Sequence, residues 1–176
     1  MLCVGWSADF QVSSPSKNAQ WSNGQTYAVS WVKGLADGVN VLDVELSRLS
    51  TSGLILVAKD VPATTGTINL ALDSVPPADD YFLLFLNSTH GVMYGNSPKF
   101  SILAASAAAA VVNGSAADAT KPTITLSGGP NPTAAFATTF PATNGALAAL
   151  PAVGGAAVGM VVVAAIGMVG GAWTVL

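Results

Sequence analysis

Charged side chains are scarce in this sequence and confined to one part of it. Only 9% of the 176 residues are Asp, Glu, Lys or Arg, and all of these lie between Asp9 and Lys121. A folded soluble domain uses charged side chains to solvate its surface, so the chain after Lys121 is expected to differ from the rest. The net charge of −3, with no basic cluster, argues against nucleic acid as a partner.

Cysteine and histidine each occur once. Cys3 alone cannot form an internal disulfide or a cysteine-rich zinc site. His90 cannot by itself build a multi-histidine metal site, and it is expected in a solvated hairpin loop. The sequence also lacks the Gly-x-Ser-x-Gly motif of serine hydrolases. We therefore expect no metal ion, no cofactor and no enzymatic activity.

Residues 9–103 contain short segments of alternating apolar and polar residues, separated by turn residues. The expected strands are 9–13, 26–32, 41–49, 54–60, 67–72, 81–87 and 99–103. Their number and spacing predict an all-β, immunoglobulin- or fibronectin-III-like antiparallel sandwich of about seven strands that folds on its own. Tyr81 opens the penultimate strand, where such sandwiches often have a tyrosine corner. The strand over Tyr81–Asn87 is apolar on both faces, which indicates a central position.

Two carboxylates, Asp43 and Glu45, lie two residues apart on one expected strand. A rise of about 3.3–3.4 Å per residue puts their Cα atoms about 6.6–6.8 Å apart, which resembles the carboxylate spacing of an inverting glycosidase. Catalytic carboxylates flank a cleft, however, and these two stand side by side. We interpret them as the polar face of an amphipathic strand, and a carbohydrate-active enzyme stays a remote alternative.

Two tryptophans are large enough to stack on a sugar ring. Trp31 shares a strand face with Tyr27 and Val29, which predicts a place in the core. Trp21 lies between expected strands, and it is the one candidate for a glycan contact.

Residues 104–144 are rich in Ala, Ser, Thr and Pro and contain few aromatic residues. Such a segment buries too little apolar area to offset the entropy lost on ordering. We expect a disordered and O-glycosylated stalk, which would reach at most about 135–150 Å when fully extended.

Residues 145–176 are almost wholly apolar. Val158–Leu176 approaches the roughly 20 residues that a bilayer-spanning helix needs. Three small residues, Asn144-Gly145-Ala146, precede it by the distance that a glycosylphosphatidylinositol (GPI) signal requires, although the spacer is apolar. A retained transmembrane helix would normally end in Lys or Arg, and none occurs here. We therefore predict GPI attachment at Asn144, with a retained helix as the alternative.

Two N-glycosylation sequons begin at Asn87 and Asn113. Residues 1–8 are apolar, and we interpret them either as the remainder of a signal peptide or as a ragged N-terminus. The sequons and the C-terminal segment together predict a glycoprotein on the extracellular face of the plasma membrane or in the cell wall.

Several loose motifs follow one another in a recognisable order. They are Phe10-Gln-Val, Ser14-Pro15, Trp21, Gly24, Tyr27-x-Val29-x-Trp31, Tyr81-x-Leu83 and Phe100-x-Ile102. In this order, residues 9–103 resemble the fungal Ser/Thr-rich GPI-anchored membrane family, whose domain is shared with the N-terminal region of Kre/Knh cell-wall-synthesis proteins. The resemblance implies an immunoglobulin-like fold, an extracellular location and a link to β-1,6-glucan or cell-wall assembly. It implies no catalytic residues.

These observations favour a non-enzymatic extracellular module, with cell-wall polysaccharide as its candidate partner and the membrane as its attachment. The alternative is a protein-interaction or adhesion domain on a single-pass membrane protein, which uses the doubly apolar strand Tyr81–Leu86 or its neighbouring edge.

Overall fold

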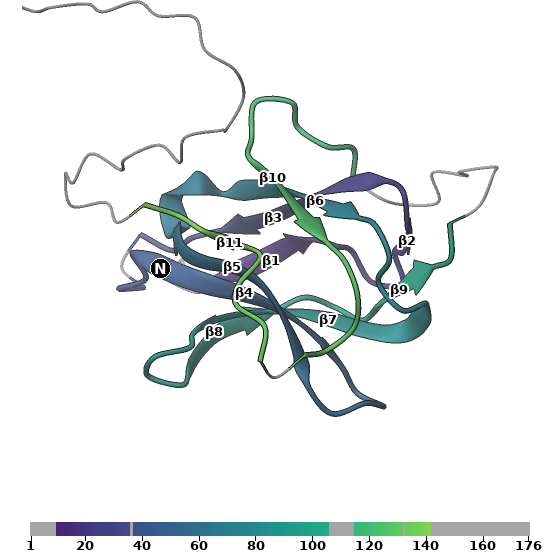
Figure 1. The fold of residues 1–176 in the computed structure, drawn as a ribbon. Helices are drawn as coiled ribbons and strands as arrows, with labels where there is room; N and C mark the ends of the chain where they lie inside the picture. The colour runs from purple at the N-terminus through teal and green to yellow at the C-terminus, as the bar shows by residue number, and fades with distance from the viewer. Residues whose placement is uncertain (1–9, 36, 106–114, 132, 142–176) are drawn as a thin grey trace, which may run out of the picture. The chain divides into compact units, whose positions relative to one another are not determined.

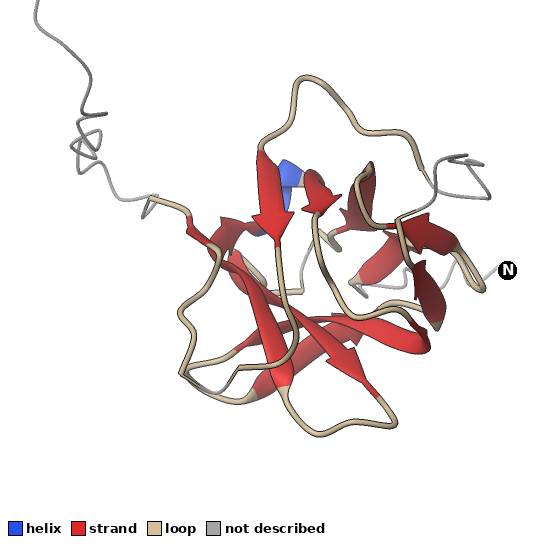
Figure 2. Ribbon diagram, turned by 45° about the vertical axis from the view of Figure 1, so that its right-hand side comes forward, coloured by secondary structure: helices blue, strands red, loops and turns tan. Residues whose placement is uncertain are grey.

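The computed structural model describes residues 10–35, 37–105, 115–131 and 133–141. These residues form two packed β-sheets and one short 3-10 helix, η1 (Ala63–Thr65) (Figures 1 and 2). The strands are β1 (Gln11–Ser14), β2 (Gln20–Ser22), β3 (Thr26–Val32), β4 (Val41–Arg48), β5 (Leu54–Pro62), β6 (Thr67–Leu72), β7 (Ala78–Asn87), β8 (Val92–Asn96), β9 (Phe100–Leu103), β10 (Thr123–Leu126) and β11 (Thr138–Thr139). The predicted all-β sandwich is confirmed, and the predicted C-terminal helix lies outside the described residues.

The first sheet has the strand order β1-β3-β6-β10, and the second has the order β11-β5-β4-β7-β9-β2, with β8 also paired to β7. The chain changes sheets at Ser14-Pro15, because β1 pairs with β3 whereas β2 pairs with β9. Proline has no N–H to donate to a sheet, which suits this break. The expected strands 26–32 and 67–72 match β3 and β6 residue for residue, whereas β2, β8, β10 and β11 were not expected.

The core lies between the sheets and contains the side chains that alternate inward along each strand. Trp31 is 3% exposed, and its indole nitrogen donates a hydrogen bond of 2.8 Å to the carbonyl oxygen of Ala63. The predicted core position of Trp31 is therefore confirmed. Its ring packs against Phe85 of the opposite sheet, with 5.5 Å between ring centroids.

The tyrosine corner is present at the start of β7. Tyr81 is fully buried, and its hydroxyl donates a hydrogen bond of 2.6 Å to the carbonyl oxygen of Pro76. The guanidinium carbon of Arg48 lies 5.4 Å from the centroid of the Tyr81 ring. The hydrogen bond ties the β6–β7 connection to the core, as it does in immunoglobulin-like sandwiches.

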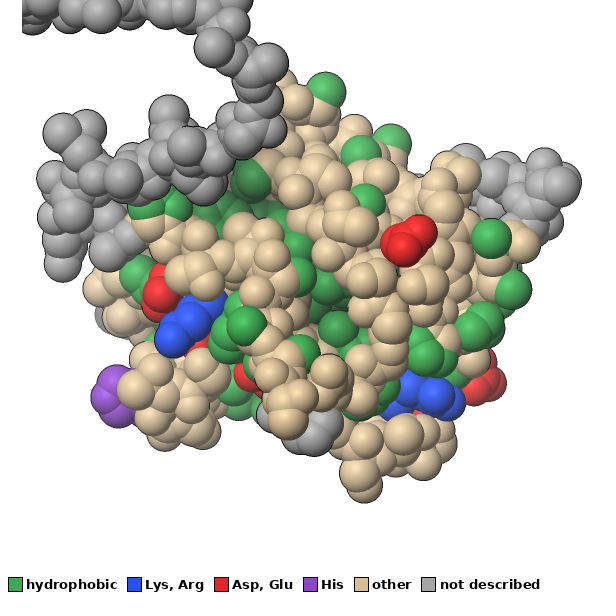
Figure 3. Space-filling view, viewed as in Figure 1, with side chains coloured by type: hydrophobic (Ala, Val, Ile, Leu, Met, Phe, Trp, Pro, Cys, Tyr) green, Lys and Arg blue, Asp and Glu red, His purple; other side chains and the backbone are tan. Residues whose placement is uncertain are grey.

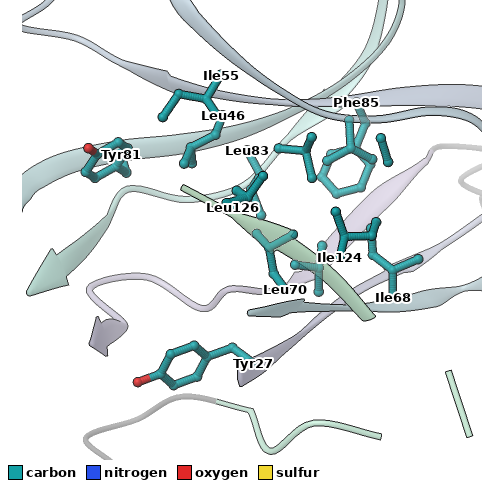
Figure 4. Close-up of a cluster of buried hydrophobic side chains, with 14 of the residues drawn as sticks. Tyr27, Leu46, Ile55, Ile68, Leu70, Tyr81, Leu83, Phe85, Ile124 and Leu126 are labelled. Atoms are coloured by element: carbon teal, nitrogen blue, oxygen red, sulfur yellow. The ribbon is translucent and has the colours of Figure 1, made fainter. Parts of the chain in front are cut away.

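The prediction of a disordered stalk over residues 104–144 is wrong for the part of this segment that the structure describes. Residues 115–131 and 133–141, which we call the C-terminal strap, lie on the sandwich and add a strand to each sheet. β10 pairs in parallel with β6, and β11 pairs in parallel with β5. Ile124 and Leu126 of β10 are each 1% exposed and point into the cluster between the sheets (Figure 4). The physical reason is that a few well-placed apolar side chains offset the ordering entropy, whatever the average composition.

The first part of the strap crosses the outer side of the first sheet. It begins beside β3, where the amide of Ala28 donates a hydrogen bond of 3.1 Å to the carbonyl oxygen of Ser115. It then passes over Asn69 of β6, whose side-chain amide donates to the carbonyl oxygens of Asp118 and Lys121 at 2.7 and 3.0 Å. These bonds explain why Asn69 is only 2% exposed in the middle of a strand.

Candidate functional site

A small hollow, which we call the Asn87 hollow, lies where β4 begins, β5 ends and β7 ends. It has a volume of about 260 Å³, and its lining includes Asp43, Asp60, Asn87, Thr89 and His90. It brings one sequon asparagine together with the single histidine and one of the two carboxylates that the sequence singled out. Among the described residues, no group of three or more His, Cys, Asp or Glu side chains is placed to hold a metal ion.

The carboxylate of Asp43 is a buried structural acceptor. Asp43 is 5% exposed, and it accepts hydrogen bonds from the backbone amides of Asp60 at 2.9 Å and Ser88 at 3.0 Å, and a short one from the Ser88 hydroxyl. These bonds join the irregular end of β5 to the turn after β7. The polar face of β4 that carries Asp43 is therefore not open to solvent, because strands and turns on both sides of β4 cover it.

Glu45 is also buried, at 4% exposure, and lies between Leu56 of β5 and Leu84 of β7. Burial, with a smaller contribution from the nearby Asp43 carboxylate, raises the pKa of Glu45 above its usual range. The polar face of β4 is therefore covered at Glu45 as well. Glu45 does not line the Asn87 hollow, so the two carboxylates do not flank a common cleft.

The outer side of β7 carries three half-buried apolar side chains, Phe82, Leu84 and Leu86. They alternate with the buried residues of the same strand and so point away from the core. Leu86 pairs with Met93 of β8, which is 58% exposed. We call these four side chains the outer face of β7. The sequence predicted a central strand that is apolar on both faces. β7 does lie between β4 and β9 in the second sheet, and its residues alternate between buried and half-buried.

A second hollow lies under the connection between β10 and β11. It has a volume of about 470 Å³, and its lining includes Leu54 and Leu56 of β5, Leu126 of β10, and Pro130 and Ala134 of the strap. Hydrophobic side chains form a band across the middle of this side of the molecule, whereas charged side chains lie in small separate groups (Figure 3). This hollow was not expected from the sequence, because the strap was predicted to be a stalk.

The sequon asparagine Asn87 lies at the end of β7 and is half-buried. Its side-chain oxygen accepts a hydrogen bond of 3.0 Å from the backbone amide of His90 and lies 3.0 Å from the Nδ1 atom of the same residue. His90 is exposed, in the turn where the sequence placed it. Ser88 and Thr89, the other two residues of the sequon, are exposed as well.

Other predicted sites lie outside the described residues. They are the second sequon at Asn113, the attachment site at Asn144, residues 1–8 and residues 145–176. Within the described part of the chain, there is no helix long and apolar enough to cross a membrane.

The burial of Trp21 contradicts its predicted role as a glycan contact. It is 0% exposed and stacks on Tyr27, with 4.9 Å between ring centroids and 2° between the ring planes. Phe100 lies against it at 4.8 Å between centroids. The missed strand β2 explains this position, because its pairing with β9 turns Trp21 into the core.

No protein-family model matches this sequence, and no curated protein matches it. Among solved structures, the chain is similar to one described as fibronectin(III)-like modules of Clostridium thermocellum CbhA. The match has 19% sequence identity, covers 55% of this chain and 94% of that one, and has a TM-score of 0.34. A likeness at this level carries no argument about activity, ligand or partner. The fibronectin-III-like sandwich, recognised here by its own strand order and tyrosine corner, is compatible with a non-enzymatic interaction module.

Proposed function

We propose that this chain is a non-enzymatic interaction module on the extracellular side of the membrane, attached through its C-terminal segment and working in cell-wall assembly. The observation that carries the non-enzymatic part is the role of Asp43. This carboxylate accepts three hydrogen bonds that hold strand ends together, so it is poorly suited to exchange protons with a substrate. Its neighbour Glu45 lies between two leucine side chains and not in the same hollow.

The attachment to the membrane is supported by the sequence of the C-terminal segment. Asn144-Gly145-Ala146 supplies the small residues that a GPI signal needs, and Val158–Leu176 supplies the hydrophobic end. The sequon at Asn87 adds support, because Ser88 and Thr89 are exposed next to it.

The link to β-1,6-glucan is supported by the resemblance of residues 9–103 to the fungal family. It is tested by incubating residues 10–141 with insoluble β-1,6-glucan and measuring the protein in the pellet. Insoluble β-1,3-glucan and cellulose serve as controls. We expect retention on β-1,6-glucan above both controls, and equal retention on all three polymers, or none, would contradict the link.

A second function, protein interaction or adhesion, is favoured by the outer face of β7. Met93 is 58% exposed beside Leu86, so apolar area is available on a flat sheet surface. The test compares Met93→Ser with Val32→Ser, which changes another exposed apolar residue, at 59% exposure, at the end of β3 in the other sheet. Cross-linking on cells should lose a protein partner with the first variant only. Equal effects of the two variants would argue against this surface.

A further inference from the structure

The Asn87 hollow lies between two segments that are distant in the sequence. Asp60 lies near the end of β5, whereas Asn87 and His90 belong to the end of β7 and the turn that follows it. Asp43 already joins these segments, because its carboxylate accepts hydrogen bonds from the backbone amides of Asp60 and Ser88. A group that occupies the hollow would contact both segments as well.

The side chain of Asn87 is held by its oxygen atom. Oδ1 accepts a hydrogen bond from the His90 amide and lies beside the Nδ1 atom of the same residue. Nδ2, the atom to which an N-glycan is attached, has no hydrogen-bond partner among the described residues. Because Oδ1 and Nδ2 diverge from one planar carboxamide, the bond to His90 directs Nδ2 away from the His90 amide. An attached sugar would keep this hydrogen bond, and its linkage would start in a defined direction beside the hollow.

The hollow has the size and chemistry for one sugar ring. Its volume of about 260 Å³ lies just below the range of roughly 300–1,000 Å³ for pockets that hold drug-sized ligands, which suits a single ring. The carboxylate of Asp60 can accept hydrogen bonds from hydroxyl or N–H groups, and Val41 adds apolar area. We propose that the first N-acetylglucosamine of an N-glycan on Asn87 sits in this hollow and stabilises the sandwich by joining the end of β5 to the turn after β7. This inference rests on the proposed N-glycosylation of Asn87.

The end of β5 is irregular, so added contacts there have an effect on stability. Asp60 has a φ angle of 57°, a left-handed conformation that is uncommon for residues other than glycine. The pairing of β4 with β5 also shifts register between Leu42 and Val44. A sugar that bonds to Asp60 would hold this segment in its folded position. The stabilisation should therefore come from the first sugar, whereas the later sugars extend into solvent.

Thermal unfolding of matched glycoforms tests this position of the sugar. The chain is residues 10–141, which contain both sheets and the core between them, with Asn113→Gln to remove the second sequon. One sample is made in a host without N-glycosylation, and a second is secreted from a eukaryotic host with its glycan intact. The third is the secreted protein after an endoglycosidase has left one N-acetylglucosamine on Asn87, which mass spectrometry verifies.

We expect the single sugar to raise the midpoint of thermal unfolding by about 3–5 °C, the shift that one added hydrogen bond brings in a domain of this size. The intact glycan should raise it no further. Asp60→Gly removes the carboxylate and tolerates the positive φ, so it should abolish most of the increase. Asn18→Gly, at another positive-φ position outside the hollow, should leave the increase unchanged.

A second measurement does not depend on stability. In the single-sugar form, nuclear Overhauser effects should connect the sugar protons with the methyl groups of Val41, which lines the hollow. A sugar on Asn87 that lacks these effects, or that stabilises Asp60→Gly as much as the unchanged chain, would overturn the proposed position alone. Absence of any sugar from Asn87 in the secreted protein would overturn both the glycosylation and the position of the sugar.

Discussion

Leu126 of the strap pairs with Leu72 of β6 in a parallel register, and both side chains are buried. The segment expected to be a stalk thus completes the core. Replacing Ile124 or Leu126 by alanine should lower the free energy of unfolding by about 2–5 kcal/mol each, the usual cost of a large-to-small change in a core. Thr125→Ala, at the exposed position between them, should change it by no more than about 0.5 kcal/mol. Urea denaturation of residues 10–141 measures all three variants.

The pairing of the strap with β6 and β5 also predicts the stability of a shorter chain. Residues 9–103 carry most of the alternating pattern, but without the strap the edges of β6 and β5 lose their partners. A chain that ends at Leu103 should therefore unfold at a lower urea concentration than residues 10–141. Identical midpoints for the two chains would mean that the strap contributes nothing to stability.

The tyrosine corner gives a second test of the fold. Tyr81→Phe removes the hydroxyl that donates to Pro76 and leaves its ring in the core. Loss of this bond should cost about 1–3 kcal/mol, because the carbonyl of Pro76 loses a partner in a part-buried place. Tyr94→Phe, which changes a half-buried tyrosine of β8, is the matched control and should cost less. A Tyr81→Phe protein as stable as the control would show that the hydrogen bond is unimportant.

The raised pKa of Glu45 leads us to expect a specific dependence of the free energy of unfolding on pH. Its pKa is raised in the folded state, so the folded protein holds the proton more tightly than the unfolded chain does. Stability is therefore lost as the pH rises from the ordinary glutamate pKa of 4.5 through the higher folded value. Glu45→Gln should stabilise the protein at pH 7 and have little effect at pH 3. Thermal unfolding at both pH values checks this, and a variant that is less stable at pH 7 would argue against it.

Asn87 should carry an N-glycan when the chain passes through a secretory pathway. Its sequon follows β7 in an exposed turn, where the modifying enzyme can reach an emerging chain. Removal of N-glycans should lower the apparent mass, and Asn87→Gln should account for a discrete part of that shift. Thr89→Ala, which leaves the asparagine in place but breaks the sequon, should have the same effect. An unchanged mass in both variants would mean that Asn87 is not modified.

The parts of the fold that the sequence predicted are those with a local pattern. Tyr27, Val29 and Trp31 alternate strictly, and β3 begins and ends where that alternation does. The strand β10, Thr-Ile-Thr-Leu, alternates in the same way between Pro122 and Ser127-Gly128. This alternation alone predicts a strand at these four residues. The prediction of a stalk over residues 104–144 followed the average composition of the segment instead.

The candidate site was harder to predict, because burial depends on partners distant in the sequence. Nothing near Asp43 indicates that the turn at Ser88 will supply its donors. Trp21 stands next to polar residues in the chain, and only its pairing with β9 buries it. Asn69 in the middle of an apolar strand was a readable signal, since a buried amide needs partners and the strap provides them.

We propose that a lipid attached at Asn144 holds this domain at the cell surface. Membranes from cells that express the full chain are treated with phosphatidylinositol-specific phospholipase C, and the protein is followed in the supernatant and analysed by mass spectrometry. Replacing Asn144-Gly145-Ala146 by bulky residues is the companion variant and should reduce anchoring. We expect release by the phospholipase, and no peptides from Val158–Leu176 in the mature protein. A protein that stays in the membrane fraction after treatment and contains those peptides would contradict lipid attachment and identify a single-pass membrane protein.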